Sequence, residues 1–341
     1  MELNQGVREV REKMSKPVVF MFSGQGSQYY QMGREFYLTN PTFRRSMLEA
    51  DEIFRMITGE SVVKQMYDDR RQKSEEFDRL LYTHPAIFMV EYSLSQVLLE
   101  RGISPNYVLG ASLGEYTAGA LAGVLDREEL IRCLVRQAQI LEAYCQKGGM
   151  LAVLENQRLY EEEPVLRENS ELAAVNFYSH FVISGSLEKL AEIEGYLQGN
   201  GTAFQRLPVS FAFHSSLLDP AAAPYTDFLK PMICREPKIG FLSCVTGHRM
   251  PAITGTHLWD VVRQPIRFQD AIGYLQRRGE HVYIDLGPTG TLANFTKYNL
   301  GGAYFGGRGQ KQAGIFSILT PFNNGTENLD RLCGSLGNCN N

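Results

Sequence analysis

The sequence predicts an α/β fold in which a large domain carries a smaller, inserted one. Strand-like and helix-like patterns alternate along most of the chain, which is typical of α/β proteins. The 341 residues are too many for one minimal domain and few for two large ones. Between residues 149 and 208 the pattern changes to the strand–helix–strand–strand–helix–strand order of ferredoxin-like domains. We therefore expect a large domain at 1–148 and 209–341, and a small domain at 149–208.

The large domain is predicted from short apolar runs and the helical segments between them. The run 17–22 ends in a turn-rich segment, and the run 106–110 leads into a second turn that contains glycine. A helix is predicted over 84–101, with Pro85 near its start and Gly102 past its end. Further strands are expected at 239–245, 281–286 and 315–319, and further helices near 113–124, 217–230, 268–278 and 290–299.

Strand-like and helix-like patterns also predict the elements of the insert. Glycines at 148–149 and 199–201 separate some of these elements from their neighbours. The expected strands of the insert lie at 150–154, 172–176, 181–185 and 203–207, and its expected helices at 157–168 and 187–198.

One helix of the large domain carries a polar residue on its apolar face. Asp126 and Glu129 form a variant capping box at its start. Its inward stripe follows steps of three and four and comprises Leu130, Leu134, Gln137, Leu141 and Tyr144. A buried amide needs hydrogen-bond partners. Gln137 is therefore either a satisfied core residue or part of a functional site, and the pattern alone leaves both open.

Composition excludes several function classes. The net charge is −4 without a basic cluster, which disfavours nucleic-acid binding. No segment approaches the ~20 apolar residues of a membrane span, and the charged N-terminus does not resemble a secretory signal. The six cysteines form no C-x-x-C pair and are expected to be reduced, while the six histidines lack metal-ligand spacing. We expect a cytoplasmic protein without a metal, with no nucleic-acid or membrane partner.

The segment Gly110-Ala111-Ser112-Leu113-Gly114 stands between a predicted strand and a predicted helix. A G-x-S-x-G segment in this context is a nucleophile elbow, in which a strained turn lifts the serine hydroxyl clear of the sheet. The N-terminus of the following helix favours a developing oxyanion. The alternative is an ordinary glycine-rich turn between a strand and a helix.

A serine nucleophile needs a base, and His214 is the candidate. It lies in Phe211-Ala212-Phe213-His214-Ser215, just after the last strand predicted for the small domain. A lone histidine among aromatic residues is more often a packed core residue. The combination with Ser112 favours the catalytic interpretation.

Several motifs, taken in order along nearly the whole chain, resemble those of malonyl-CoA:carrier-protein acyltransferases. They are GQGSQ at 24–28, GASLGE at 110–115, VISG at 182–185, FAFHS at 211–215, PIRF at 265–268 and DLGP at 285–288. The resemblance implies an α/β-hydrolase-like large domain with a ferredoxin-like insert, in agreement with the patterns above.

The resemblance also implies roles for individual residues. Ser112 would be the nucleophile and His214 its general base and later acid. The backbone carbonyl of Arg267 would orient the histidine, where other serine enzymes place a carboxylate. The backbone amides of Gln25 and Leu113 would form the oxyanion hole. Asn176 matches a family asparagine near the site.

Three departures from the family pattern bear on the substrate. Ala111 replaces the histidine that precedes the family's serine. Gln137 occupies the position where malonyl-loading members carry an arginine that grips the malonyl carboxylate. The neighbouring Arg136 is rotated by about 100° on the helix and should not substitute. Phe211 replaces a polar residue. Since a malonyl carboxylate would be buried without a partner, we expect acetyl, propionyl or longer uncharged chains.

Departures of this kind resemble the stand-alone acyl hydrolases that accompany trans-acyltransferase polyketide synthases in antibiotic biosynthesis. We expect a monomeric hydrolase that removes neutral acyl groups from acyl-carrier proteins. The substrate would arrive on the carrier's 4'-phosphopantetheine arm, with no cofactor bound to the enzyme itself. A transferase that moves acyl or malonyl units to a carrier protein, and a degenerate member that only binds carriers, are the alternatives.

Overall fold

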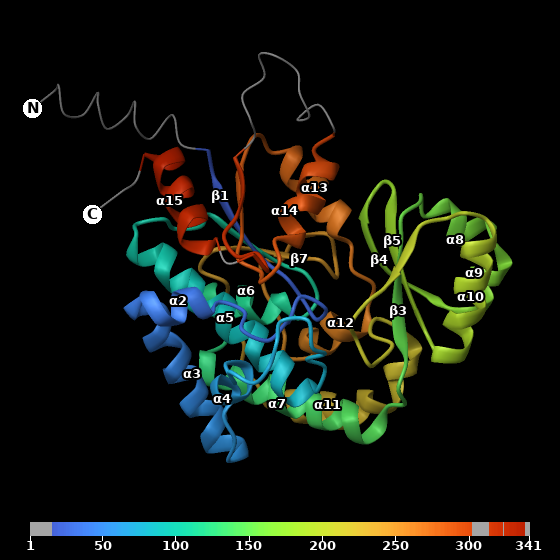
Figure 1. The fold of residues 1–341 in the computed structure, drawn as a ribbon, viewed down its shortest axis with the longest axis horizontal. Helices are drawn as coiled ribbons and strands as arrows, with labels where there is room; N and C mark the ends of the chain where they lie inside the picture. Colours follow the sequence, from blue (N-terminus) through green and yellow to red (C-terminus); the bar gives the residue numbers. More distant parts are fainter. Residues whose placement is uncertain (1–15, 302–313, 323, 338–341) are drawn as a thin grey trace, which may run out of the picture.

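The computed structural model describes residues 16–301, 314–322 and 324–337. Its larger sheet has the strand order β10-β9-β1-β2-β7-β8, and Figure 1 shows this sheet inside the larger body of the molecule. All neighbouring pairs are parallel except β7 with β8. The strands are β1 (Val18–Phe22), β2 (Tyr107–Gly110), β7 (Gly240–Ser243), β8 (His248–Arg249), β9 (Val282–Asp285) and β10 (Ile315–Ser317).

Alternate residues of the central strand pack against opposite faces of this sheet. Phe20 and Phe22 belong to the main core with the helices α3, α5, α6 and α7. Val19 and Met21 belong to a second core with α13 and α14. Both faces are therefore covered, as parallel sheets require. The helices are α3 (Pro41–Thr58), α5 (Leu80–Glu100), α6 (Gly114–Leu121), α7 (Arg127–Tyr144), α13 (Phe268–Gln276) and α14 (Thr291–Asn299).

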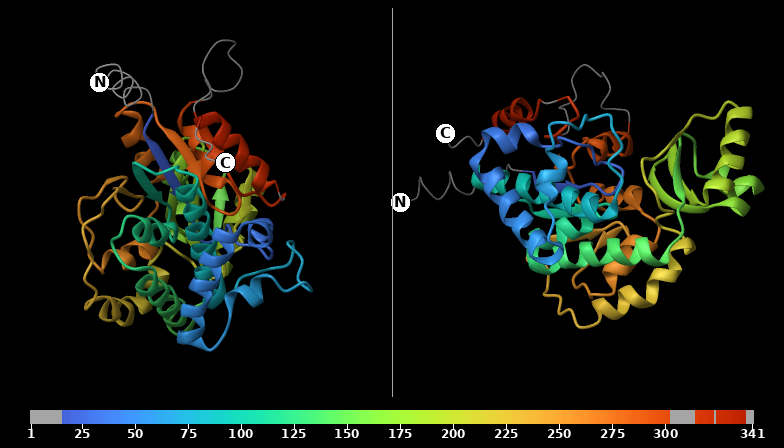
Figure 2. Two further views of the ribbon diagram at one scale, coloured as in Figure 1. Left: turned by 90° about the vertical axis from the view of Figure 1, so that its left-hand side faces the viewer. Right: turned by 60° about the horizontal axis from the view of Figure 1, so that its bottom comes forward.

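The second sheet is antiparallel, in the order β4-β5-β3-β6, which is the strand order of a ferredoxin-like fold. It has its own apolar core and projects from one side of the larger body (Figure 2). All of it lies inside the segment predicted as the insert. Its elements are β3 (Gly149–Val153), α8 (Arg158–Glu162), α9 (Pro164–Asn169), β4 (Glu171–Phe177), β5 (His180–Gly185), α10 (Leu187–Gly199) and β6 (Phe204–Arg206).

The predicted α/β class with an inserted ferredoxin-like domain is thus confirmed, and the differences lie in element boundaries. Pro164 starts a new helix, so the helix predicted over 157–168 is split into two. Helix α5 begins at Leu80 and contains Pro85 in its second turn. The capping bond from the Asp126 amide to Glu129 is present at 2.8 Å.

Several elements of the structure were not predicted from the sequence. They are α2 (Arg34–Thr39), α3, α4 (Val62–Met66), β8, α12 (His257–Arg263) and α15 (Gly325–Leu336). The helix predicted near 217–230 is present as the 3₁₀ helix η1 (Ser216–Ala221), which α11 (Ala222–Leu229) continues. None of the helices in the described ranges is long and apolar enough to cross a membrane.

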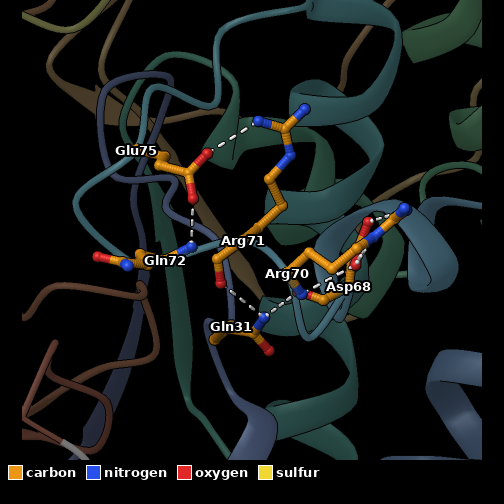
Figure 3. A network of polar contacts seen from close by, with 6 residues as sticks. All are labelled: Gln31, Asp68, Arg70, Arg71, Gln72 and Glu75. Carbon is orange, nitrogen blue, oxygen red and sulfur yellow. Dashed lines mark hydrogen bonds and ion pairs between the residues drawn. The ribbon is translucent and has the colours of Figure 1, made fainter.

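A polar loop leads from α4 into α5, the helix that later contributes to the site. Asp68 pairs with Arg70, and Arg71 pairs with Glu75. The Gln31 side chain donates to the Asp68 carbonyl at 2.7 Å and to the Arg71 carbonyl at 3.3 Å (Figure 3). Exposed ion pairs contribute little stability, so the bonds from the buried Gln31 do most to fix the path of this loop.

Candidate active site

The segment around Ser112 is a strained turn between β2 and α6. Ser112 has φ 53°, in the left-handed region that L-residues rarely adopt. The register pairs Phe22 of β1 with Gly110 of β2, so the loops after these two parallel strands leave the same sheet edge side by side. This geometry is the nucleophile elbow predicted from the sequence.

The two glycines of the elbow are required by close backbone packing. A Cβ atom at Gly114 would overlap the carbonyl oxygen of Phe22, and one at Gly110 would overlap the backbone of Glu115. In both cases the obstacle is main chain, which cannot move aside without shifting β1 or α6.

We therefore expect Gly114→Ala to lower the unfolding temperature strongly and to abolish activity, since overpacking a close contact costs roughly 1–3 kcal/mol or more. Thermal unfolding of this variant beside Gly119→Ala provides the measurement. A Cβ at Gly119 meets only a side-chain atom, of Val124, at 4.0 Å, so the control should change little. Equal unfolding temperatures for the two variants would contradict this account.

Ser112 and His214 come from distant parts of the chain and meet at this edge. The Ser112 hydroxyl lies 2.9 Å from Nε2 of His214. Nδ1 of His214 lies 2.7 Å from the backbone carbonyl of Gln264. A carbonyl only accepts, so Nδ1 carries the proton and Nε2 is free to accept from the serine. His214 also has a positive φ, 60°, and its amide donates to the Val262 carbonyl at 3.0 Å.

The carbonyl that orients the histidine belongs to Gln264, and the prediction of Arg267 is wrong. The segment between the two residues runs beside β4, where the Ile266 amide donates to Ala173 at 2.8 Å. Arg267 then caps α13, and its carbonyl accepts from the Ala271 amide at 3.1 Å. That carbonyl is therefore committed to the first turn of a helix.

Burial lowers the pKa of His214 from 6.5 to about 4, while the Gln264 carbonyl partly opposes this shift and the charge of Arg263 adds to it. His214 is therefore neutral, and able to accept a proton, at all pH values well above 4.

We expect the rate of serine acylation to stay level from neutral pH down to about pH 5 and to fall as the pH passes through 4. Stopped-flow acylation across this range, with histidine NMR to assign the titration, measures the inflection. An inflection near 6.5 would mean that the histidine is solvated and not held as the structure shows.

The loop after β1 lies against the elbow. A Cβ at Gly24 would come within 2.9 Å of the Ser112 Cβ and 3.3 Å of the Leu113 amide. In the described ranges, the amides of Gln25 and Leu113 donate no backbone hydrogen bond. Two free amides beside a nucleophile are the arrangement that an oxyanion hole needs, so the role expected of Gln25 and Leu113 is compatible with the geometry and stays a prediction.

A cavity of about 400 Å³ opens between the two sheets, with Ser112 and His214 in its wall. Ala111 and Asn176, both proposed from the sequence, also line it. The Asn176 amide lies 3.1 Å from Nδ1 of His180. The small domain contributes mostly apolar side chains, among them Met150, Ala152, Ala174, Val182 and Leu207.

Gln137 lies on the other side of Ser112, in a second and much smaller cavity. This niche, as we call it, has a volume of about 10 Å³ and is lined by Gln25, His84, Ser112, Leu113, Tyr116, Gln137, Phe213, Val261 and Val262. Gln137 is 2% exposed and donates to the Tyr116 hydroxyl at 2.7 Å. The amide has the hydrogen bond that the core interpretation requires, and the side chain also borders the niche beside Ser112, so a role in the site stays a prediction. Arg136 is exposed, as its rotation on the helix predicted.

Phe211 lines neither cavity, so the expectation that this departure from the family pattern bears directly on the substrate is wrong. It is fully buried, packs edge-on against Phe213 at a centroid distance of 6.3 Å, and lies under the Lys147 ammonium at 4.5 Å. The ring that reaches both cavities is that of Phe213.

Comparison with known proteins agrees with the site and the fold. Residues 19–301 match the family model described as acyl transferase domain. The chain belongs to the acyl transferase family. It is 46% identical to the polyketide biosynthesis acyltransferase homolog BaeD of Bacillus velezensis, over 95% of this chain and 98% of that one. It is 45% identical to the homolog PksD of Bacillus subtilis, over 93% and 96%.

A solved acyl transferase domain has the same fold. The acyltransferase domain from the second module of the salinomycin polyketide synthase superposes with a TM-score of 0.82 at 28% identity, covering 96% of this chain and 74% of that one. The predicted architecture is thus confirmed by a structure as well as by the strand order.

In the present protein, two buried residues near the site were not predicted from the sequence. Glu91 of α5 accepts from the Ser23 amide at 2.7 Å and from the Thr117 hydroxyl at 2.9 Å. Desolvation raises the pKa of its carboxyl well above the usual range. It ties the loop of Gln25 to α6. The second such residue is His84. Both are ionisable residues in a helix that is buried on nearly all sides, and this was the available signal in the sequence.

Proposed function

We propose that this protein hydrolyses acyl thioesters of acyl-carrier proteins through an acyl-Ser112 intermediate, in polyketide biosynthesis. The observation that carries the proposal is the aligned chain of Ser112, His214 and the Gln264 carbonyl in the wall of the cleft between the domains. Its family membership and its similarity to polyketide biosynthesis acyltransferase homologs support the substrate class.

The reaction follows from the geometry in two halves. The Ser112 oxygen attacks the thioester carbonyl and gives its proton to Nε2 of His214, while the amides of Gln25 and Leu113 stabilise the oxyanion. The carbon–sulfur bond breaks and the thiol leaves with that proton. Water then attacks the ester, again giving its proton to Nε2, and the carboxylic acid departs from the regenerated serine.

The two cavities at Ser112 suggest where the two parts of the substrate lie, the phosphopantetheine arm and the acyl group. A phosphopantetheine arm is long and must reach solvent, so it fits the open cleft of about 400 Å³. The acyl group bonded to Ser112 then lies near the niche with Gln137, whose volume of about 10 Å³ admits roughly one of its atoms unless side chains rearrange. No lysine or arginine is among the niche residues, and a carboxylate buried there would lack a partner. The preferred acyl groups are therefore short and uncharged.

A transferase that passes the acyl group to a second carrier is the other candidate, favoured by the names of the curated relatives. Acetyl-carrier protein incubated with the enzyme, with and without an unloaded second carrier, separates the two. Hydrolysis predicts equal release of acetate in both reactions and a second carrier that stays unloaded by intact mass. Acetyl transfer to the second carrier in amounts that match the loss from the first would overturn the hydrolase proposal.

Gln137→Arg is expected to raise the ratio of malonyl to acetyl loading on Ser112 by tenfold or more, equivalent to about 1.4 kcal/mol. A guanidinium at position 137, once the side chains around it rearrange, can pair with the malonyl carboxylate, whereas an unpaired one beside an apolar acyl group disfavours acetyl loading. Intact-protein mass after mixing with malonyl-CoA or acetyl-CoA gives both values. Arg136→Gln, on the exposed face, is the matched control. A parent protein that already loads malonyl as fully as acetyl would refute the role of Gln137.

A further inference from the structure

Two side chains that line the niche behind Ser112, those of His84 and Gln25, carry three buried polar atoms without a hydrogen-bond partner among the described residues. His84 is 1% exposed, and neither of its ring nitrogens has a hydrogen bond to the described protein atoms. Oε1 of Gln25 is also buried and unpaired. The Gln25 side chain is fixed at its other end, where its amide nitrogen donates to the Thr83 hydroxyl at 3.0 Å. Leaving such groups unpaired costs roughly 1–3 kcal/mol each, so the niche is built for a polar occupant.

The size of the niche limits that occupant. Its volume of about 10 Å³ corresponds to roughly one water molecule or one hydroxyl group. The remaining walls are largely apolar, with Leu113, Phe213, Val261 and Val262. A single oxygen atom therefore fits, and a larger polar group does not fit unless side chains rearrange.

The hydrogen-bond donors and acceptors of the residues around the niche determine which kind of oxygen, hydroxyl or carbonyl, they can bind. Desolvation lowers the pKa of His84 to about 3, so the ring is neutral and offers one N–H donor and one acceptor nitrogen. Gln25 Oε1 only accepts. A hydroxyl both accepts and donates and can satisfy two of these groups at once. A ketone or a carboxylate only accepts and would leave Oε1 of Gln25 unpaired.

We propose that His84 and Gln25 bind the hydroxyl of a short hydroxyacyl group carried by Ser112, and hold one water in its place in the free enzyme. This inference rests on the proposed function and narrows its substrate class. The niche is lined by Ser112 itself, so only carbons close to the ester can place a hydroxyl there. A hydroxyl on carbon 2 or 3 of a chain of three or four carbons meets this condition.

The test compares acyl groups that differ at one carbon. Butyryl, 3-hydroxybutyryl and 3-oxobutyryl pantetheine thioesters are mixed with the protein, and Ser112 acylation is followed by rapid-quench intact mass. We expect 3-hydroxybutyryl to acylate about tenfold faster than butyryl, with 3-oxobutyryl slower than the hydroxy compound. Ratios measured on one preparation do not depend on the fraction of folded enzyme.

Two variants assign the effect to His84. His84→Met removes both nitrogens at similar volume and should bring the ratio of hydroxybutyryl to butyryl close to one. His84→Gln keeps a donor and an acceptor and should retain most of the preference. Equal ratios in the parent and the methionine variant would overturn the proposal, even if both variants fold and acylate.

The crystal structures of the free protein and of its butyryl and hydroxybutyryl adducts distinguish the two sources of the oxygen. The proposal predicts a niche water that the substrate hydroxyl displaces. A water retained in both adducts, with equal acylation rates, would show that the niche serves water alone and would refute the inference. If acetyl, butyryl and hydroxybutyryl groups all fail to acylate Ser112, the proposed function itself fails. Acylation without discrimination defeats only the inference.

Discussion

Ser112→Ala is expected to abolish the release of acyl groups from carrier proteins while leaving the fold intact. The serine oxygen is the atom that forms the ester, and no neighbouring hydroxyl lies within hydrogen-bond distance of His214 in its place among the described residues. Alanine carries the same Cβ as serine at φ 53°, so the strain of the turn changes little and the unfolding temperature should stay within a few degrees.

The measurement is loss of acetyl from acetyl-carrier protein by intact mass, beside thermal unfolding. Ser210→Ala serves as the matched control, since Ser210 bonds to Asp78 and lines neither cavity. Turnover in Ser112→Ala at the level of the Ser210 variant would remove Ser112 from the mechanism.

His214→Ala should lower turnover by roughly 10²–10⁴-fold, the contribution of a positioned general base. The loss is large because His214 is the one side chain in the described ranges that is hydrogen-bonded to the Ser112 hydroxyl. Both acylation and deacylation should slow, since the same nitrogen takes the proton in each half.

Single-turnover acylation and steady-state release, measured separately, test this expectation. His248→Ala is a suitable control because His248 is exposed, on β8 at the sheet edge. A His214 variant within a few-fold of the parent in both steps would exclude it as the base.

The sequence could predict those parts of the site where the backbone geometry permits only one type of residue. Gly110 and Gly114 are needed because the main chain of β1 and α6 approaches too closely for a Cβ. This requirement produces the G-x-S-x-G pattern around Ser112, which can be recognised in the sequence. The fold was predictable for a similar reason, because a fully buried parallel sheet leaves continuous apolar runs.

Other parts had no comparable signal. A backbone carbonyl can be supplied by any residue, so the difference between Gln264 and Arg267 depends on where the chain leaves β4 and enters α13. Phe211 stands three residues before His214 in the sequence, but which of two neighbouring rings reaches the cavity depends on tertiary packing.

The sequence carries a signal at His84 and Glu91 that does not identify their roles. Both are ionisable residues in a helix that is buried on nearly all sides. Such residues are rarely buried without a purpose. Their roles depend on the tertiary packing of α5 beside the loop of Gln25, where Glu91 holds that loop and His84 borders the niche.

The central claim, a covalent acyl-Ser112 intermediate, is tested most directly by intact-mass and peptide mass spectrometry after rapid quenching with acetyl-carrier protein. The account predicts a transient acetyl adduct confined to the peptide that contains Ser112, absent from Ser112→Ala and decaying as acetate appears. An adduct on another residue, or acetate release without any adduct on the millisecond timescale in the parent protein, would contradict it.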